Sequence, residues 1–456
     1  MINLLFALAL LFSSIEGLWY GTIPAGAKQL RVSITIKASG DALTGTFNSL
    51  DQGSGELPLD DVKLVDGTLR FKLKLAGGDY EGKLDGDTID GAWTQHGLSA
   101  PLKLARVDAI PTPPRPQEPK KPYPYAEEEV LVDHAKAGIH LGGTLTLPKT
   151  KPPFPAVVLV SGSGPQDRDE TVFGHKPFLI LADDLTRRGI AVLRVDDRGV
   201  GKSTGVRDKA TTEDFAGDVA ACVAFLKSRK DIDPKHIGLV GHSEGGMIAP
   251  MVATRSKDVA FIVLLAGPGV PGDELINLQQ AAILRSMGAS DAMVAEMNAL
   301  QRKIIAVTKE TPDETTLRAK LKALMTAEIA KSSDEAKPMF ADVDAMIDSQ
   351  IKRLSAPWYR WMLAYDPRSN LAKVRVPMLA VNGSKDVQVT PKENLAAIHA
   401  AAPNATIVEL PGLNHLLQTA PTGSLLEYAS IEETMAPAAL NVVGEWIRKQ
   451  TMNDER

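Results

Sequence analysis

The sequence predicts two folded parts: a small antiparallel β domain, then an α/β domain with a mostly parallel sheet covered by helices on both faces. Residues 18–107 alternate apolar and polar side chains at period two, with turn residues at even spacing. Residues 126–266 and 375–456 alternate apolar strands with helical patterns, which is typical of buried parallel sheets. Residues 267–374 show helical patterns alone and therefore predict a helical cap inserted into the second domain.

The composition excludes several classes of protein. A hydrophobic content of 44% and a charged content of 23% are typical of a globular protein, and 456 residues are too many for one ordinary core. The net charge of -5 gives no basic footprint, so nucleic acid is not an expected partner. Cys222 is the single cysteine, and no Cys or His cluster has metal-ligand spacing. We therefore predict no intramolecular disulfide, no metal and no cofactor, and assign no oligomeric state.

The first 17 residues predict a signal peptide. The apolar run at 1–12 is too short to span a bilayer but fits the apolar core of an export signal. It lacks a preceding Lys or Arg and an Ala-x-Ala site, so a misassigned start and a membrane tether are the alternatives. We expect a periplasmic or secreted protein if the segment acts as a signal, and a cytoplasmic one otherwise.

The β domain at 18–107 is expected to be a small barrel or sandwich. About eight strands in this length would close into a meander whose pattern resembles lipocalin-like and streptavidin-like barrels. Trp19, Phe71 and Trp93 are expected in its core rather than in a ligand site. The clearest alternating segments are 30–36, 43–47, 69–75, 80–84, 89–93 and 101–105.

Seven prolines lie between residues 108 and 124, which predicts an extended, semi-rigid linker over 108–125. After it, 128–133 and 139–147 are expected to pair as a hairpin. Further strands are expected at 156–160, 190–195, 237–240, 261–265, 377–381 and 406–410, with helices at 178–185, 213–227, from 244, from 393 and at 431–449. The cap is expected to contain helices at 278–287, 292–307, 316–330 and 342–354.

Ser243 is the central chemical residue. It lies in Gly-His-Ser-Glu-Gly, between the strand that ends at Val240 and a helix. So tight a reversal needs glycine at Gly241 and Gly245, and it exposes the serine hydroxyl at the carboxyl edge of the sheet. The free N–H groups of the following helix suit a developing oxyanion.

A serine hydroxyl needs a base, and the base needs an acid that fixes its tautomer. His415 follows the last strand and Asp386 follows the strand that ends at Val381, so both lie at the same sheet edge. The alternatives are a loop histidine bonded to Asn414 and a turn-forming aspartate. Asp366 and Asp344 belong to the cap and are less favourable acids.

Two main-chain N–H groups are expected to bind an oxyanion. One is that of Glu244, directly after the serine, and the other is that of Ser163, in the small-residue loop after the strand at 156–160, with Gly162 beside it. A plain tight turn is the alternative.

These residues resemble the α/β-hydrolase superfamily. The order Ser243, Asp386, His415, the serine turn and the Ser161-Gly-Ser-Gly loop look like that superfamily. The hairpin segment Gly138-Ile-His-Leu-Gly-Gly-Thr-Leu is similar to its bacterial serine carboxylesterase branch, near the prolyl-oligopeptidase-like and dienelactone-hydrolase-like proteins. The resemblance covers the chain from about Val130 to its end and implies the α/β-hydrolase fold. Ser161 stands where the family's His-Gly-x-x loop has histidine.

Two other patterns need an interpretation. Residues 199–203 look like the end of a phosphate loop, but Asp196 stands where that motif requires glycine. We expect this turn to support the sheet edge, with Arg198 paired to Asp167, Asp169 or Asp197. In the cap, the rings of Trp358, Tyr359 and Trp361 either pack together or line a substrate pocket.

The sequence therefore predicts a serine carboxylesterase that cleaves small-molecule esters with short to medium acyl chains. A peptidase or amide hydrolase of the prolyl-oligopeptidase type is the alternative enzyme, although the usual propeller domain has no counterpart in this sequence. A binding protein with an inert hydrolase domain is the alternative outside enzymes.

Overall fold

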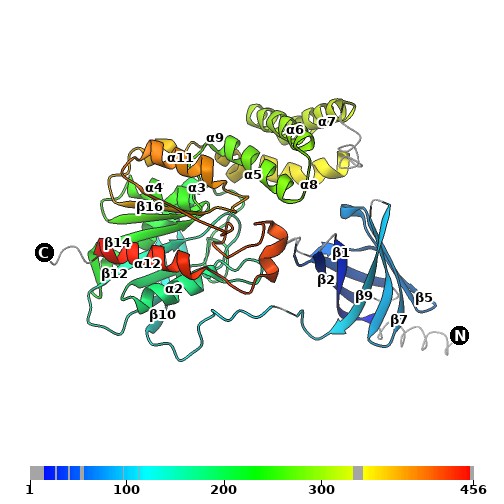
Figure 1. Cartoon of the computed structure of the whole chain (residues 1–456), viewed down its shortest axis with the longest axis horizontal. Coiled ribbons are helices and arrows are strands. Elements are labelled where there is room, and N and C mark those ends of the chain that lie inside the picture. The colour runs from blue at the N-terminus through cyan, green and yellow to red at the C-terminus, as the bar shows by residue number, and fades with distance from the viewer. Residues whose placement is uncertain are drawn as a thin grey trace. The chain divides into compact units, whose positions relative to one another are not determined.

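The computed structural model describes residues 15–25, 28–39, 42–51, 56–95, 97–111, 113–331 and 343–451. The chain divides into two compact units (Figure 1), one formed by Met1–Pro114 and Leu425–Ser430 and the other by Arg115–Ser424 and Ile431–Arg456. The predicted signal peptide lies outside the described residues except for its last three positions.

The first unit contains an antiparallel sheet of nine strands in the order β4-β3-β2-β1-β9-β8-β7-β6-β5. The sheet curls far enough for β5 to contact β3, so it is a nearly closed barrel, as the sequence predicts. The strands are β1 (Gly17–Ala25), β2 (Lys28–Ser39), β3 (Ala42–Ser49), β4 (Leu57–Pro58), β5 (Asp60–Val65), β6 (Thr68–Leu73), β7 (Gly78–Asp85), β8 (Thr88–Gln95) and β9 (Leu98–Val107).

Aromatic side chains fill the barrel. Trp19, Phe71 and Trp93 are at most 5% exposed, which confirms the prediction that they form its core. Phe47 stacks on Trp93 with ring centroids 5.2 Å apart, and Phe71 stacks on Tyr80 at 5.0 Å. An interior filled in this way is a packed core, since small barrels leave little space beyond their own side chains.

The second unit is built on a sheet of eight strands in the order β10-β11-β13-β12-β14-β15-β16-β17. β10 and β11 form the predicted hairpin, β11 pairs antiparallel with β13, and all other neighbours pair parallel. The strands are β10 (Ala126–His134), β11 (Ile139–Leu147), β12 (Phe154–Val160), β13 (Ala191–Val195), β14 (Ile232–His242), β15 (Phe261–Leu265), β16 (Met378–Gly383) and β17 (Thr406–Leu410).

Helices cover both faces of this sheet, as predicted (Figure 1). Side chains alternate along β12: Val157 and Leu159 pack with α2 and α12, whereas Val158 and Val160 pack with α3, α4 and α11. The central strands β12, β13, β15 and β16 are mostly apolar because both of their faces are buried. The helices are α2 (Pro177–Arg187), α12 (Pro437–Thr451), α3 (Thr212–Ser228), α4 (Gly245–Ala253) and α11 (Pro391–Ala401).

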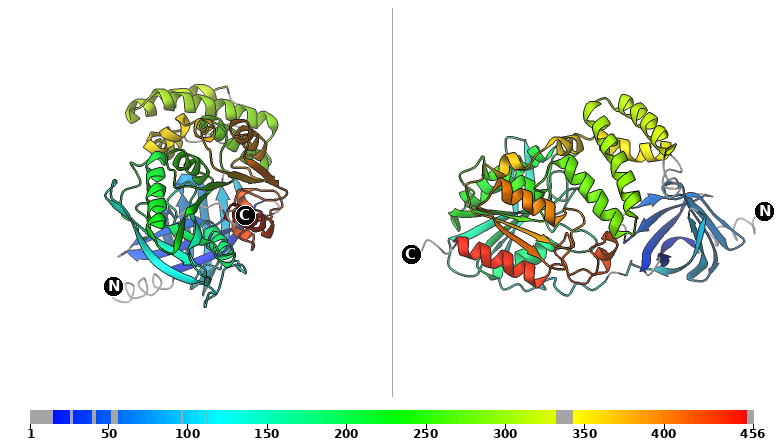
Figure 2. Two further views of the ribbon diagram at one scale, coloured as in Figure 1. Left: turned by 90° about the vertical axis from the view of Figure 1, so that its left-hand side faces the viewer. Right: turned by 45° about the horizontal axis from the view of Figure 1, so that its top comes forward.

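A helical insertion separates β15 from β16, and its green and yellow helices form a layer of their own in Figure 2. It has its own apolar core, which includes Leu317, Leu321 and Tyr359. α9 contacts α5, α6 and α8 and also reaches α3, so it joins the insertion to the sheet layers. The helices are α5 (Gly272–Ser286), α6 (Asp291–Glu310), α7 (Glu314–Ile329), α8 (Val343–Ser355), α9 (Pro357–Ala364) and α10 (Arg368–Leu371).

The second half of the proline-rich linker is bonded to the second unit. The Arg115 guanidinium donates to the carbonyl oxygen of Ile431 at 2.7 Å and also to those of Phe173 and Gly174. The Gln117 side chain donates to the Met435 carbonyl at 2.7 Å and accepts from the Thr434 and Met435 N–H groups. This stretch is therefore a strap rather than a free spacer.

Among the described residues, none of the helices combines the length and the apolar character needed to cross a bilayer.

Candidate active site

Ser243 lies in a strained turn between β14 and α4. Its φ is 52°, in the left-handed region that side chains other than glycine rarely adopt. A Cβ on Gly241 would collide with the carbonyl of Gly245, and a Cβ on Gly245 would collide with that of Val160. The two glycines are therefore required by close main-chain packing, and the serine is held half-buried at the end of β14.

The structure brings His415 and Asp386 into contact. Asp386 Oδ2 lies 2.8 Å from His415 Nδ1, and both residues are less than 5% exposed. The other carboxylate oxygen, Oδ1, accepts from the N–H groups of Gln388 and Val389 at 2.8 and 2.9 Å. A carboxylate fixed by these contacts holds Nδ1 as the protonated nitrogen and leaves Nε2 as the nitrogen for proton exchange.

The two cap aspartates lie in ion pairs of their own. Asp366 pairs with Arg368 at 2.7 Å, and Asp344 pairs with Lys322 at 2.8 Å.

The loop after β12 passes close to the serine. A Cβ on Gly162 would lie 3.2 Å from Ser243 Cβ. The Gly162 N–H already donates to Glu170 Oε1 at 2.7 Å, so Ser163 carries the next N–H of the loop that could face an oxyanion. The Ser161 hydroxyl donates to Asp197 Oδ1 at 2.7 Å, which fastens the loop to the end of β13. This is the role of the serine at the family's usual histidine position.

The side chain of Glu244 connects three elements. It is 2% exposed, and its Oε1 accepts from Thr212 at the start of α3 and from the Trp358 indole of α9, both at 2.7 Å. The residue whose N–H group is a predicted oxyanion donor is thereby bonded to the cap.

Two residues near the serine were not predicted as site residues. His242 is buried, its Nδ1 lies 2.9 Å from Glu170 Oε1, and its Nε2 lies 3.1 Å from the carbonyl oxygen of His415. The rings of His242 and His415 are 4.8 Å apart. No sequence pattern indicated Glu170, because it lies 72 residues before its partner in an irregular loop.

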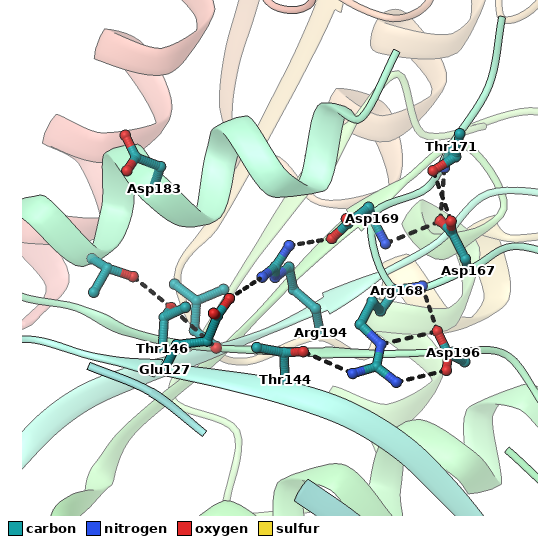
Figure 3. Close-up of polar contacts among 12 residues, drawn as sticks. Glu127, Thr144, Thr146, Asp167, Arg168, Asp169, Thr171, Asp183, Arg194 and Asp196 are labelled. Carbon is teal, nitrogen blue, oxygen red and sulfur yellow. Dashed lines mark hydrogen bonds and ion pairs between the residues drawn. The ribbon is translucent and has the colours of Figure 1, made fainter. Parts of the chain in front are cut away.

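Ion pairs brace the loop that carries Glu170 (Figure 3). Arg168 forms a two-point contact with Asp196, at 3.1 Å through Nε and 2.8 Å through Nη2, and also donates to Thr144 at 2.8 Å. Arg194, 2% exposed, pairs with Asp169. Asp167 accepts from the N–H group and hydroxyl of Thr171, at 2.9 and 2.7 Å. The loop is therefore fixed on both sides of Glu170.

The prediction for Arg198 is wrong. It pairs with Asp218 of α3 at 2.7 Å and not with Asp167, Asp169 or Asp197. Arg198 follows β13 and turns toward α3, where Asp218 is buried, whereas Arg207 takes Asp197 at 2.8 Å.

A cavity of about 40 Å³ lies beside the loop that follows β12, and Ser161, Gly162, Asp197 and Glu244 are among the residues that line it. This volume has room for one or two water molecules. Burial raises the pKa of Asp197 to about 6, against the opposing effects of Arg207 and of the Ser161 hydroxyl.

A larger cavity of about 280 Å³ lies inside the cap and is lined by Met297, Leu300, Leu321, Gln280 and Arg353 among others. The three predicted pocket aromatics lie elsewhere. Trp358 bonds to Glu244, Tyr359 is buried in the cap core, and Trp361 stacks on Tyr365 at 4.4 Å. No cluster of His, Cys, Asp and Glu able to hold a metal ion occurs within the part of the chain that the structure describes.

A mostly parallel sheet, with a serine elbow after one strand and a histidine–aspartate pair after two others, defines the α/β-hydrolase class. The model of the alpha/beta hydrolase family matches residues 157–425, more than half of the chain, and the chain belongs to this family.

Individual relatives resemble the chain more distantly. Esterase EstD of Thermotoga maritima is 29% identical over 298 residues, which are 65% of this chain and 61% of EstD. The chain thus matches less than two thirds of that relative's length. The α/β hydrolase GrgF from Penicillium sp. sh18 is 16% identical, with a TM-score of 0.46 over 71% of this chain and 99% of GrgF.

Proposed function

We propose that this protein is a serine carboxylesterase that hydrolyses small-molecule esters. The observation that carries the proposal is the buried 2.8 Å contact between His415 and Asp386, at the sheet edge where Ser243 is held in a left-handed turn. The similarity to an esterase supports ester substrates.

In the first half of the proposed reaction, the Ser243 hydroxyl oxygen attacks the ester carbonyl carbon and its proton passes to His415 Nε2. The carbonyl π bond opens, and the N–H groups of Ser163 and Glu244 bind the resulting oxyanion. When the carbonyl re-forms, the bond to the alcohol oxygen breaks and the alcohol leaves with the proton from His415. Asp386 stabilises the imidazolium throughout.

The second half repeats these steps with water. His415 accepts a proton from the water as its oxygen attacks the acyl carbon, and the same N–H groups bind the second oxyanion. The Ser243 oxygen then leaves, takes the proton back from His415, and the carboxylic acid departs. No oxidation state changes in these steps, and His415 passes on each proton that it accepts, so the proposed cycle needs no redox partner.

The cap supports a preference for short to medium acyl chains, because α9 lies beside the residue that follows the nucleophile and restricts the space for a substrate there. Trp358 contributes to this restriction, since its indole bonds to the residue that follows the nucleophile.

The test is hydrolysis of p-nitrophenyl esters from acetate to palmitate by wild type and Ser243→Ala. We expect kcat to fall by several orders of magnitude in the variant, and fluorophosphonate labelling to be lost with it. Ser228→Ala, an exposed serine at the end of α3, is the matched control and should behave as wild type.

Ester turnover by Ser243→Ala at the wild-type rate would refute the proposal. Faster cleavage of a matching anilide than of the ester would instead assign the site to amide hydrolysis.

A further inference from the structure

The buried pair of His242 and Glu170 touches three of the four loops on which the proposed reaction depends, all but the loop of Asp386. His242 directly precedes Ser243, and its ring reaches the carbonyl of His415. Glu170 Oε1 contacts His242 Nδ1 and also accepts a hydrogen bond from the Gly162 N–H of the loop that carries Ser163. These loops follow three different strands, β14, β17 and β12, and only this pair joins them among the hydrogen bonds described above.

The partners of His242 determine its charge. Nδ1 faces a carboxylate oxygen and Nε2 faces a main-chain carbonyl oxygen, and both of these oxygens accept hydrogen bonds. With Glu170 ionised, each ring nitrogen donates a hydrogen bond, which requires the imidazolium form of the ring. The Gly162 N–H, as a second donor to the same oxygen, is consistent with an ionised Glu170.

We infer that His242 and Glu170 are positioning residues, an ion pair that sets the distance of the Ser163 N–H and of His415 from the Ser243 hydroxyl. By occupying the Gly162 N–H, Glu170 directs the oxyanion toward the next amide of the loop. By donating to the main chain at His415, the imidazolium fixes the loop of the base. The inference rests on the proposed function.

The residues around Glu170 hold it in a fixed position. Glu170 is 2% exposed and has φ 53°, a backbone conformation that persists only where neighbours enforce it. The neighbours are Arg168 with Asp196 and Arg194 with Asp169 (Figure 3). A misplacement of about 1 Å at a reacting centre can lower a rate by about 100-fold, so a brace at this place has a large effect.

The ionisable groups that face His242 are Glu170, Asp386 and the His415 ring. Burial lowers the pKa of the His242 imidazolium, but the Glu170 carboxylate and the hydrogen bonds to Glu170 and to the His415 carbonyl raise it, with a net upward direction. The pair is therefore intact below this raised pKa and is lost when His242 deprotonates as the pH rises through it.

The experiment compares Glu170→Gln and His242→Gln with wild type in p-nitrophenyl acetate hydrolysis between about pH 6 and pH 10. Rates are divided by the number of sites that a fluorophosphonate labels, so that unfolded molecules do not count. We expect kcat per labelled site to fall about 10- to 100-fold, with KM within about threefold of wild type. The alkaline decline of wild-type kcat that His242 causes should be absent in both variants.

His236→Gln is the matched control. His236 lies on the same strand, six residues before His242, and contacts Asp233 at 2.8 Å. Its kcat and pH profile should equal those of wild type.

A kcat per labelled site within twofold of wild type in both variants would overturn the inference, as would an alkaline decline that persists in both. A purely structural pair would lower the number of labelled sites and leave kcat per site unchanged. Failure of the proposed function would be seen separately, as absence of ester turnover by wild type or full turnover by Ser243→Ala.

Discussion

Ser243 is half-buried and has an unfavourable backbone conformation. A non-glycine residue at φ 52° carries strain of about 1–3 kcal/mol. The surrounding elements hold it there through main-chain contacts, including the hydrogen bond from the Ser243 N–H to the Leu265 carbonyl at 2.9 Å. The turn therefore stores strain where the nucleophile is needed.

This strain gives a prediction about stability. Ser243→Gly should raise the free energy of unfolding by about 1 kcal/mol over Ser243→Ala, because glycine adopts positive φ without a Cβ penalty. Urea unfolding of the two inactive variants checks it. Equal midpoints, with equal dependence on urea, would show that the turn is unstrained.

The contact between Asp386 and His415 gives a second prediction. Asp386→Asn should lower kcat by about 10⁴-fold at neutral pH, because an amide can donate to Nδ1 and thereby favour the wrong tautomer of His415. Steady-state kinetics measure it. Asp366→Asn, which alters the cap ion pair with Arg368, serves as control and should retain the wild-type kcat.

The positions of residues that directly follow a strand were predictable, and contacts between distant loops were not. Ser243, Asp386 and His415 each follow a strand, and parallel strands bring such positions to one edge. Glu170 and the correct partner of Arg198 depend on how loops turn after the strands end. That path is set by side-chain contacts between distant segments, which apolar periodicity does not encode.

At the scale of elements, the side chain of Glu244 links the cap to the turn that carries Ser243. Glu244 accepts from Thr212 of α3 and Trp358 of α9 through the same oxygen, while its Oε2 is buried with no hydrogen-bond partner in the described structure. A buried carboxylate so placed is sensitive to the loss of either donor.

Trp358→Phe removes the indole donor and keeps an aromatic ring. We expect stability to fall by about 1–3 kcal/mol and kcat to fall several-fold, because Glu244 loses the contact that holds its main-chain N–H in place. Thermal unfolding and p-nitrophenyl butyrate kinetics measure the two effects. Trp361→Phe, which changes a ring stacked on Tyr365, should leave kcat unchanged, and equal effects of both variants would contradict this role.

Some element boundaries matched the predictions closely, but α5 begins six residues before its expected start at 278 and α12 begins six residues after its expected start at 431. β17 has its expected bounds, and the cap helices α6 to α8 lie within two residues of their predicted starts. α9 and α10 were missed because a short helix that begins at or after a proline leaves too few turns to show a helical period. The place of α9 between cap and sheet is a tertiary contact and could not be predicted.

At the scale of the whole molecule, stability should depend on pH through Asp197. An ordinary aspartate has a pKa of about 3.9, and burial raises that of Asp197 to about 6. Between these values the folded protein binds more protons at this site than the unfolded chain, so the contribution of Asp197 to stability falls as pH rises.

Relative to Asp197→Asn, wild type should lose roughly 2 kcal/mol of unfolding free energy between about pH 4 and pH 7. Urea unfolding at both pH values measures this difference. A wild type that gains stability over the variant as pH rises would show that the ion pair with Arg207 outweighs burial.

The strap formed by Arg115 and Gln117 determines where the linker can be cut by a protease or joined to another domain. The linker by composition runs to residue 125, but these two side chains bond to main-chain groups of Ile431, Thr434 and Met435, far along the chain. A non-specific protease acting on the intact protein should therefore cut before Arg115, and should cut between 115 and 125 only when both residues are changed to alanine. A protein engineer who joins the second unit to another domain should place the junction ahead of Arg115. A junction at β10 would remove the strap and with it the hydrogen bonds that hold residues 431–435.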